Sequence, residues 1–245
     1  MIKLKLKRRK NKKFLLNNRT KIILLVIFIV IDIFLIYSFI KVREAVNINQ
    51  LNNEFYELLE VNFTSGDYDS RVNTSGKYGE AEKAMIDYFK AYSDKTKDIL
   101  KVVNDKEFTN LLSVENYNSE DKEFKEDINY IIKTKEDLDK KFNELYNYSS
   151  EESINKYIES VSDDKKVRKL FKDYMLSIDA NNYFDDCNTL LKKKQDEIDN
   201  ILDTSRDVFY FLVVNNGKWL IKDDQIQFAN NSLKQQYDDY IAKIK

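Results

Sequence analysis

Apolar residues recur at intervals of three and four along most of the chain, a spacing that places them on one face of an α-helix. From residue 79 onward this spacing predicts helices over about 79–104, 108–112 and 119–145, and further helices starting at Ser149, which precedes Glu152 as in a capping box, and near Val167. Polar, turn-favouring segments interrupt the pattern at 62–78, 114–119 and 148–150. Because short amphipathic helices are stable only when their apolar faces pack together, we expect an antiparallel helical bundle.

The stretch before Gly217 carries both helix and strand signals. Apolar positions from Leu191 to Leu212 fall on one helical face, so we predict a long helix that begins near Tyr183 and runs through 208–214, with Gly217 at or just beyond its end. Residues 208–214 are nevertheless rich in strand-forming side chains, and Asn216-Gly217 is a hairpin signal. A strand over 208–214 is therefore the alternative.

Residues 218–228 alternate apolar and polar side chains, which predicts a small β-hairpin. The hairpin face combines Trp219, Ile221, Ile226 and Phe228, and Asp223-Asp224 between the two halves fits a turn. We expect this face either to pack on the helices or to bind a ligand. Asn231-Ser232 then predicts the cap of a terminal helix.

The N-terminal part of the chain has the layout of a membrane anchor. Residues 22–40 form an apolar run of nineteen residues with a single charge, which is long enough to span a bilayer as a helix. Ten Lys and Arg residues and no acid precede it, so the positive-inside rule places the N-terminus in the cytoplasm. No small-residue cleavage pattern follows, which favours an uncleaved signal anchor over a cleaved signal peptide. The predicted segments are a basic cytoplasmic tail (1–21), a transmembrane helix (22–40), a helical stalk (41–61), a flexible loop (62–78) and an extracytoplasmic bundle (79–245).

The single charge in that run, Asp32, lies near its centre. A carboxylate at the middle of a bilayer costs about 2.5–3.5 kcal/mol on insertion scales. One interpretation is an intramembrane contact, with a polar group of another membrane helix or with Asp32 of a second copy. The other is tolerance, because the strongly apolar neighbours outweigh one acidic residue.

Composition excludes most kinds of chemistry. The chain has no His and a single Cys, Cys187, which removes the commonest general base and the usual zinc ligand sets. No Gly-rich phosphate-binding loop is present, and a calcium-loop count from Asp67 fails at Val72 and Tyr78. From Lys41 onward the net charge is −10, which disfavours nucleic acid as a ligand. We therefore predict no enzymatic activity, no cofactor, no metal and no nucleic-acid partner.

The ending KWLIKDDQIQF, from Lys218 to Phe228, follows a basic tail, an anchor and a helical exterior. This arrangement resembles uncharacterised single-pass membrane proteins of low-GC Gram-positive bacteria, and the resemblance implies no site residues. The chain is predicted to be a membrane-anchored, extracytoplasmic protein-interaction module, an accessory subunit of a membrane or cell-envelope complex. It would contact the bilayer through 22–40, bind another envelope protein, and could form a homo-oligomer through the span. The alternative is an extracytoplasmic domain that senses or binds a small molecule.

Overall fold

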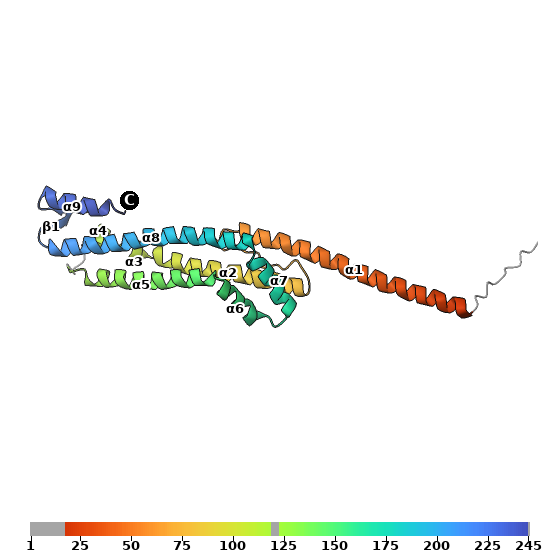
Figure 1. The fold of residues 1–245 in the computed structure, drawn as a ribbon. Coiled ribbons are helices and arrows are strands. Elements are labelled where there is room, and N and C mark those ends of the chain that lie inside the picture. The colour runs from red at the N-terminus through yellow and green to blue at the C-terminus, as the bar shows by residue number, and fades with distance from the viewer. Residues whose placement is uncertain (1–17, 119–122, 245) are drawn as a thin grey trace, which may run out of the picture. The chain divides into compact units, whose positions relative to one another are not determined.

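A computed structural model describes the backbone of residues 18–118 and 123–244, and their side chains from residue 29 onward. These residues are mainly helical with one two-stranded antiparallel sheet near the C-terminus, which confirms the predicted helical fold and hairpin (Figure 1). The long helices are α1 (Asn18–Glu60), α2 (Lys77–Val103), α5 (Lys125–Tyr148) and α8 (Ile178–Val214). The shorter elements are α3 (Lys106–Thr109), α4 (Val114–Tyr117), α6 (Glu151–Val161), α7 (Lys165–Met175), β1 (Trp219–Lys222), β2 (Gln225–Phe228) and α9 (Asn231–Ile241).

The chain divides into two units, Met1–Asn49 and Gln50–Lys245, and α1 passes from the first into the second without a break. Within the part of the chain that the structure describes, no helix is both long enough and apolar enough to span a membrane. The predicted basic tail up to residue 17 lies outside the described residues, as do the side chains of residues 22–28 of the predicted span.

The second unit is built on the apolar stripes of its long helices. α5 lies against both α2 and α8, while α7 lies against α2 and α6. Lys135 of α5 is 2.7 Å from Asp203 of α8, and the Tyr146 hydroxyl donates a 3.1 Å hydrogen bond to Gln195. Residue numbers therefore rise in α5 as they fall in α8, so these two helices are antiparallel, as the bundle prediction requires.

The predicted strand alternative for 208–214 is wrong, because α8 continues through Val214. Val208, Phe209 and Leu212 are fully buried at helical spacing, so packing on the bundle outweighs the strand preference of these residues. The backbone N–H of Asn215 donates to Phe211 and ends the helix, and Gly217 follows two residues later with φ 79°.

Two predicted helix starts lie elsewhere because side-chain caps set them. α8 begins at Ile178 rather than near Tyr183, since Ser177 accepts a hydrogen bond from the N–H of Ala180. α6 is capped by Ser150 and not by Ser149, because the Ser150 hydroxyl oxygen accepts from the N–H of Ser153.

Three further boundaries also differ from the sequence prediction. The predicted reversal at 114–119 contains α4, which Ser113 caps by accepting from Asn116. α9 is capped one residue early, at Asn230, which accepts from the N–H of Leu233. α5 starts at Lys125, behind Phe124 in the left-handed conformation, rather than near Ser119.

The flexible loop was predicted over 62–78. The residues between α1 and α2, 61–76, instead form an irregular segment that packs on the bundle and that we call the strap. Phe63 and Tyr68 are buried, with their ring centroids 5.9 Å from those of Tyr92 and Phe89 respectively. The preceding end of α1 is buried as well, through Leu51, Phe55 and Leu58. The compact unit therefore includes the strap and the end of the predicted stalk.

Candidate functional site

The hairpin brings its four apolar side chains onto one face. Trp219 pairs with Phe228 and Ile221 with Ile226 in the register of β1 and β2, so all four point the same way. The turn residues Asp223 and Asp224 both have φ 52°, as expected for a tight two-residue hairpin turn.

This hairpin face is occupied by the protein's own core. The indole Nε1 of Trp219 donates a 2.9 Å hydrogen bond to the carbonyl of Leu212, and only 9% of the residue is exposed. The Phe228 ring lies 5.9 Å from Phe211 and 5.2 Å from Tyr237. A ligand at this face would have to displace these contacts.

Phe124 completes the aromatic cluster under the hairpin, and sequence analysis missed it. It has φ 49°, yet it is fully buried, with its ring centroid 4.9 Å from Phe209 and 6.2 Å from Trp219. A left-handed conformation costs a non-glycine residue roughly 1–2 kcal/mol, which burial of an aromatic ring exceeds. No local sequence signal marks this position, since Gly or Asn is the usual left-handed residue.

Asp32 belongs to the first unit, whereas the hairpin belongs to the second. It is exposed on α1, within a stretch in which ten large apolar residues are also exposed, each by 47–69%. These residues are Ile29, Val30, Ile31, Ile33, Phe34, Leu35, Ile36, Tyr37, Phe39 and Ile40. An exposed helix that is apolar on all sides is typical of a segment that lipid or another protein covers.

A buried carboxylate holds the strap on α2. Glu82 is fully buried and accepts hydrogen bonds from the N–H of Asn73 (2.7 Å), the N–H of Thr74 (2.8 Å) and the Thr74 hydroxyl (2.6 Å). The Asn73 side chain in turn donates a 2.7 Å bond to Glu54 at the end of α1. The strap thus ties α1 to α2 through polar groups that the helical pattern alone did not reveal.

A small cleft of about 180 Å³ lies beside Glu54, the residue that accepts the hydrogen bond from Asn73. Its lining combines four acidic and three apolar residues, which are Glu54, Glu57, Asp67, Asp69, Leu58, Val61 and Ile86. Burial raises the pKa of Glu54, the hydrogen bond from Asn73 opposes this shift, and the carboxylates of Glu57, Glu82 and Asp69 add to it. The cleft concentrates negative charge without a cation among its lining residues.

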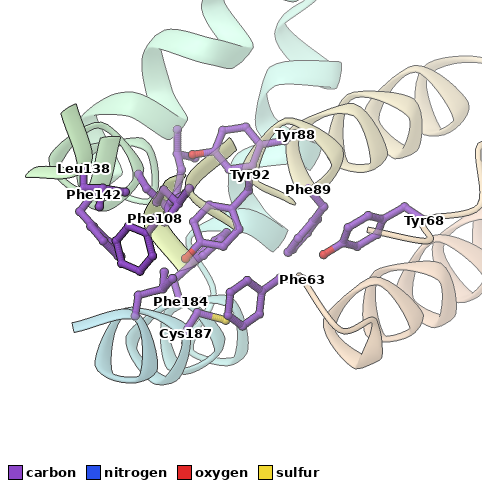
Figure 2. Packing of buried hydrophobic residues seen from close by; sticks show 14 of the residues in the cluster. Phe63, Tyr68, Tyr88, Phe89, Tyr92, Phe108, Leu138, Phe142, Phe184 and Cys187 are labelled. Atoms are coloured by element: carbon purple, nitrogen blue, oxygen red, sulfur yellow. The ribbon is translucent and has the colours of Figure 1, made fainter. Parts of the chain in front are cut away.

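Buried hydrophobic side chains, many of them aromatic, pack together in the second unit (Figure 2). The Tyr88 ring is stacked on Tyr148 at 4.5 Å, and its hydroxyl donates to the Tyr148 carbonyl. Burial raises the pKa of the Cys187 thiol to about 11, so this thiol is protonated at neutral pH and a poor nucleophile. The Cys187 thiol therefore contributes to the packing of the core as an uncharged group.

Among the residues that the structure describes, no group of three or more Cys, Asp or Glu side chains is placed to hold a metal ion. No protein-family model, no curated protein and no solved structure matches the chain.

Proposed function

We propose that the chain is a membrane-anchored, non-enzymatic interaction module, an accessory subunit of a membrane or cell-envelope complex. Residues 22–40 lie in the bilayer, the tail 1–21 is cytoplasmic, and the second unit meets its protein partner outside. The observation that supports this proposal is the exposed apolar surface of α1 from Ile29 to Ile40.

The magnitudes favour a covered segment. Fully burying one large apolar side chain contributes about 1.5–3 kcal/mol, so removing the exposed half of ten such side chains from water would contribute on the order of 10 kcal/mol. An Asp32 carboxylate within the bilayer costs only about 2.5–3.5 kcal/mol. Lipid around this segment is therefore favourable despite the charge, and the ten basic residues before it set its direction.

Topology is tested in bacterial cells that produce the full chain with the Cys187→Ser substitution, which removes its single native thiol. Ser70→Cys, at an exposed position of the strap, should react with a membrane-impermeant maleimide in intact spheroplasts. Lys5→Cys should react only after permeabilisation. A chain that alkaline carbonate releases from membranes, or labelling of both positions before permeabilisation, would refute the anchor.

The interaction role is tested separately, at Asp32. A photo-crosslinking amino acid at Ile31 or Ile33 should capture the same membrane protein in repeated preparations, and Asp32→Leu should abolish that capture. Asp32→Asn is the matched control, because it keeps hydrogen bonding and removes the charge. If Asp32→Leu leaves the captured partner unchanged, Asp32 makes no specific intramembrane contact.

The alternative role, a domain that senses or binds a small molecule, stays a prediction. Its discriminating measurement is the fluorescence of Trp219, the single Trp of the chain. A ligand that displaced the packing of the hairpin face would shift the Trp219 emission, whereas an interaction module would keep a buried, ligand-insensitive spectrum.

A further inference from the structure

The turn between α8 and β1 exposes the dipeptide Asn216-Gly217 without hydrogen-bonding the Asn216 side chain or the Gly217 N–H. Both residues are exposed, and neither the Asn216 carboxamide nor the Gly217 N–H has a hydrogen-bond partner among the described residues. Gly217 has φ 79°, and a Cβ built there would meet nothing within 4 Å, so its backbone nitrogen is unobstructed. The flanking amides are engaged, because Asn216 N–H donates to Val213 (3.1 Å) and Lys218 N–H to Asn215 (2.9 Å).

The strap supplies the opposite arrangement in the same protein. The Asn73 carboxamide nitrogen donates to Glu54, and the N–H of the next residue, Thr74, donates to the buried Glu82. Both the side-chain amide and the following backbone nitrogen are thus held at Asn73-Thr74, while both are free at Asn216-Gly217.

We propose that Asn216-Gly217 is a site of spontaneous covalent modification, at which the Asn216 carboxamide is lost through a cyclic imide. The Gly217 nitrogen gives its proton to solvent base and attacks Cγ of Asn216, forming a new C–N bond and closing a five-membered ring. The bond from Cγ to the side-chain nitrogen breaks and ammonia leaves. One water then opens the ring at either carbonyl, which gives an aspartate or an isoaspartate without any oxidation or reduction.

The two products act differently on the hairpin. Aspartate adds one negative charge at an exposed position and leaves the length of the main chain unchanged. Isoaspartate inserts a methylene into the main chain between Asn216 and Gly217, inside the turn that the Lys218–Asn215 hydrogen bond closes. Since Trp219 follows Lys218 and is anchored to Leu212, the isoaspartate form loosens the hairpin. The loss of ammonia is not reversed in either product, so both mark an aged molecule.

The test uses the purified full chain in detergent micelles, incubated in mildly alkaline buffer made with ¹⁸O-labelled water and mapped by peptide mass spectrometry. Asn216 should convert with incorporation of one ¹⁸O, faster at higher pH, and Asn216→Gln should show no reaction there. Asn73 should convert at least about tenfold more slowly, because Thr74 is bulkier than Gly217 and its nitrogen must first break a hydrogen bond to a charged acceptor. The isoaspartate fraction, separated by chromatography, should show Trp219 emission at longer wavelength than either unreacted protein or fresh Asn216→Asp.

Two results would overturn the proposal. One is an Asn216 that stays intact in the native chain while the same chain converts in denaturant, which would mean that the fold blocks the attack. The other is equal conversion at Asn216 and Asn73. An isoaspartate form with unchanged emission would remove the proposed effect on the hairpin.

Discussion

Replacing Glu82 by Ala should release the strap from α2 and destabilise the second unit. Hydrogen bonds to a charged acceptor contribute about 1.5–3 kcal/mol each, and Glu82 accepts three of them. Burying the Glu82 carboxylate costs several kcal/mol of desolvation, and the Ala variant avoids this cost, so the net loss of stability is smaller than the sum of the three hydrogen bonds. We therefore expect Glu82→Ala to lower the free energy of unfolding by about 3–4 kcal/mol, because the Thr74 N–H and hydroxyl stay buried without an acceptor.

The assay is urea unfolding of the full chain in micelles, followed by far-UV circular dichroism, together with hydrogen exchange of the strap amides. Glu80→Ala is the matched control, since Glu80 is exposed on the same helix and its loss should change stability by less than about 0.5 kcal/mol. Thr74→Val should lose the hydroxyl bond alone, about 1.5–3 kcal/mol. If Glu82→Ala unfolds like Glu80→Ala and the strap amides exchange no faster, the hydrogen bonds to Glu82 do not stabilise the unit and the reasoning is refuted.

Three other predictions concern the core and the strap. Phe124→Ala should lower the unfolding free energy by about 3–5 kcal/mol and move the Trp219 emission to longer wavelength, because the ring stacked on the indole is lost; unchanged emission would contradict the packing. Cys187 should react with a thiol reagent at neutral pH only after unfolding, and rapid labelling of the native chain would contradict this. Its burial should also lower the free energy of unfolding as the pH rises from 9 towards the folded pKa of about 11, because the thiol ionises at lower pH in the unfolded chain than in the folded one. Gly66→Ala should destabilise more than Gly217→Ala in urea unfolding, because both have positive φ but only at Gly66 would a Cβ collide with side chains of α2.

The long elements could be predicted because one physical term dominates them. Ile131, Leu138, Phe142 and Leu145 are buried at helical spacing in α5, and burial of that stripe decides the structure whatever the surface residues are. The hairpin was predictable for the same reason, with a period of two instead of 3.6.

The missed features depend on contacts between residues of different elements, which the local sequence pattern does not encode. The strap has the polar, Gly-containing composition of a mobile loop, and it is fixed by the packing of Phe63 and Tyr68 on α2 together with the hydrogen bonds to Glu82. In the sequence, Glu82 cannot be distinguished from an exposed helix carboxylate. Its donors come from the strap, the most distant of them nine residues earlier in the chain. Phe124 adopts a conformation that its residue type disfavours, and the aromatic rings that compensate come from Phe209 and Trp219.

The distribution of aromatic residues makes the second unit report separately on its two ends. Figure 1 places β1 and α9 at one end of the bundle, and α6 and α7 at the other. The only indole, Trp219, lies at the first end, while Tyr88, Tyr148 and Tyr157 form a packed group that joins α2, α5 and α6. Selective excitation of the indole therefore follows the hairpin. Near-UV circular dichroism of the tyrosines reports on both ends, because Tyr117 and Tyr237 pack beside the hairpin. A change in that signal without a shift of the indole emission therefore marks a loss of packing away from the hairpin. Partial unfolding from either end can be distinguished without any attached label.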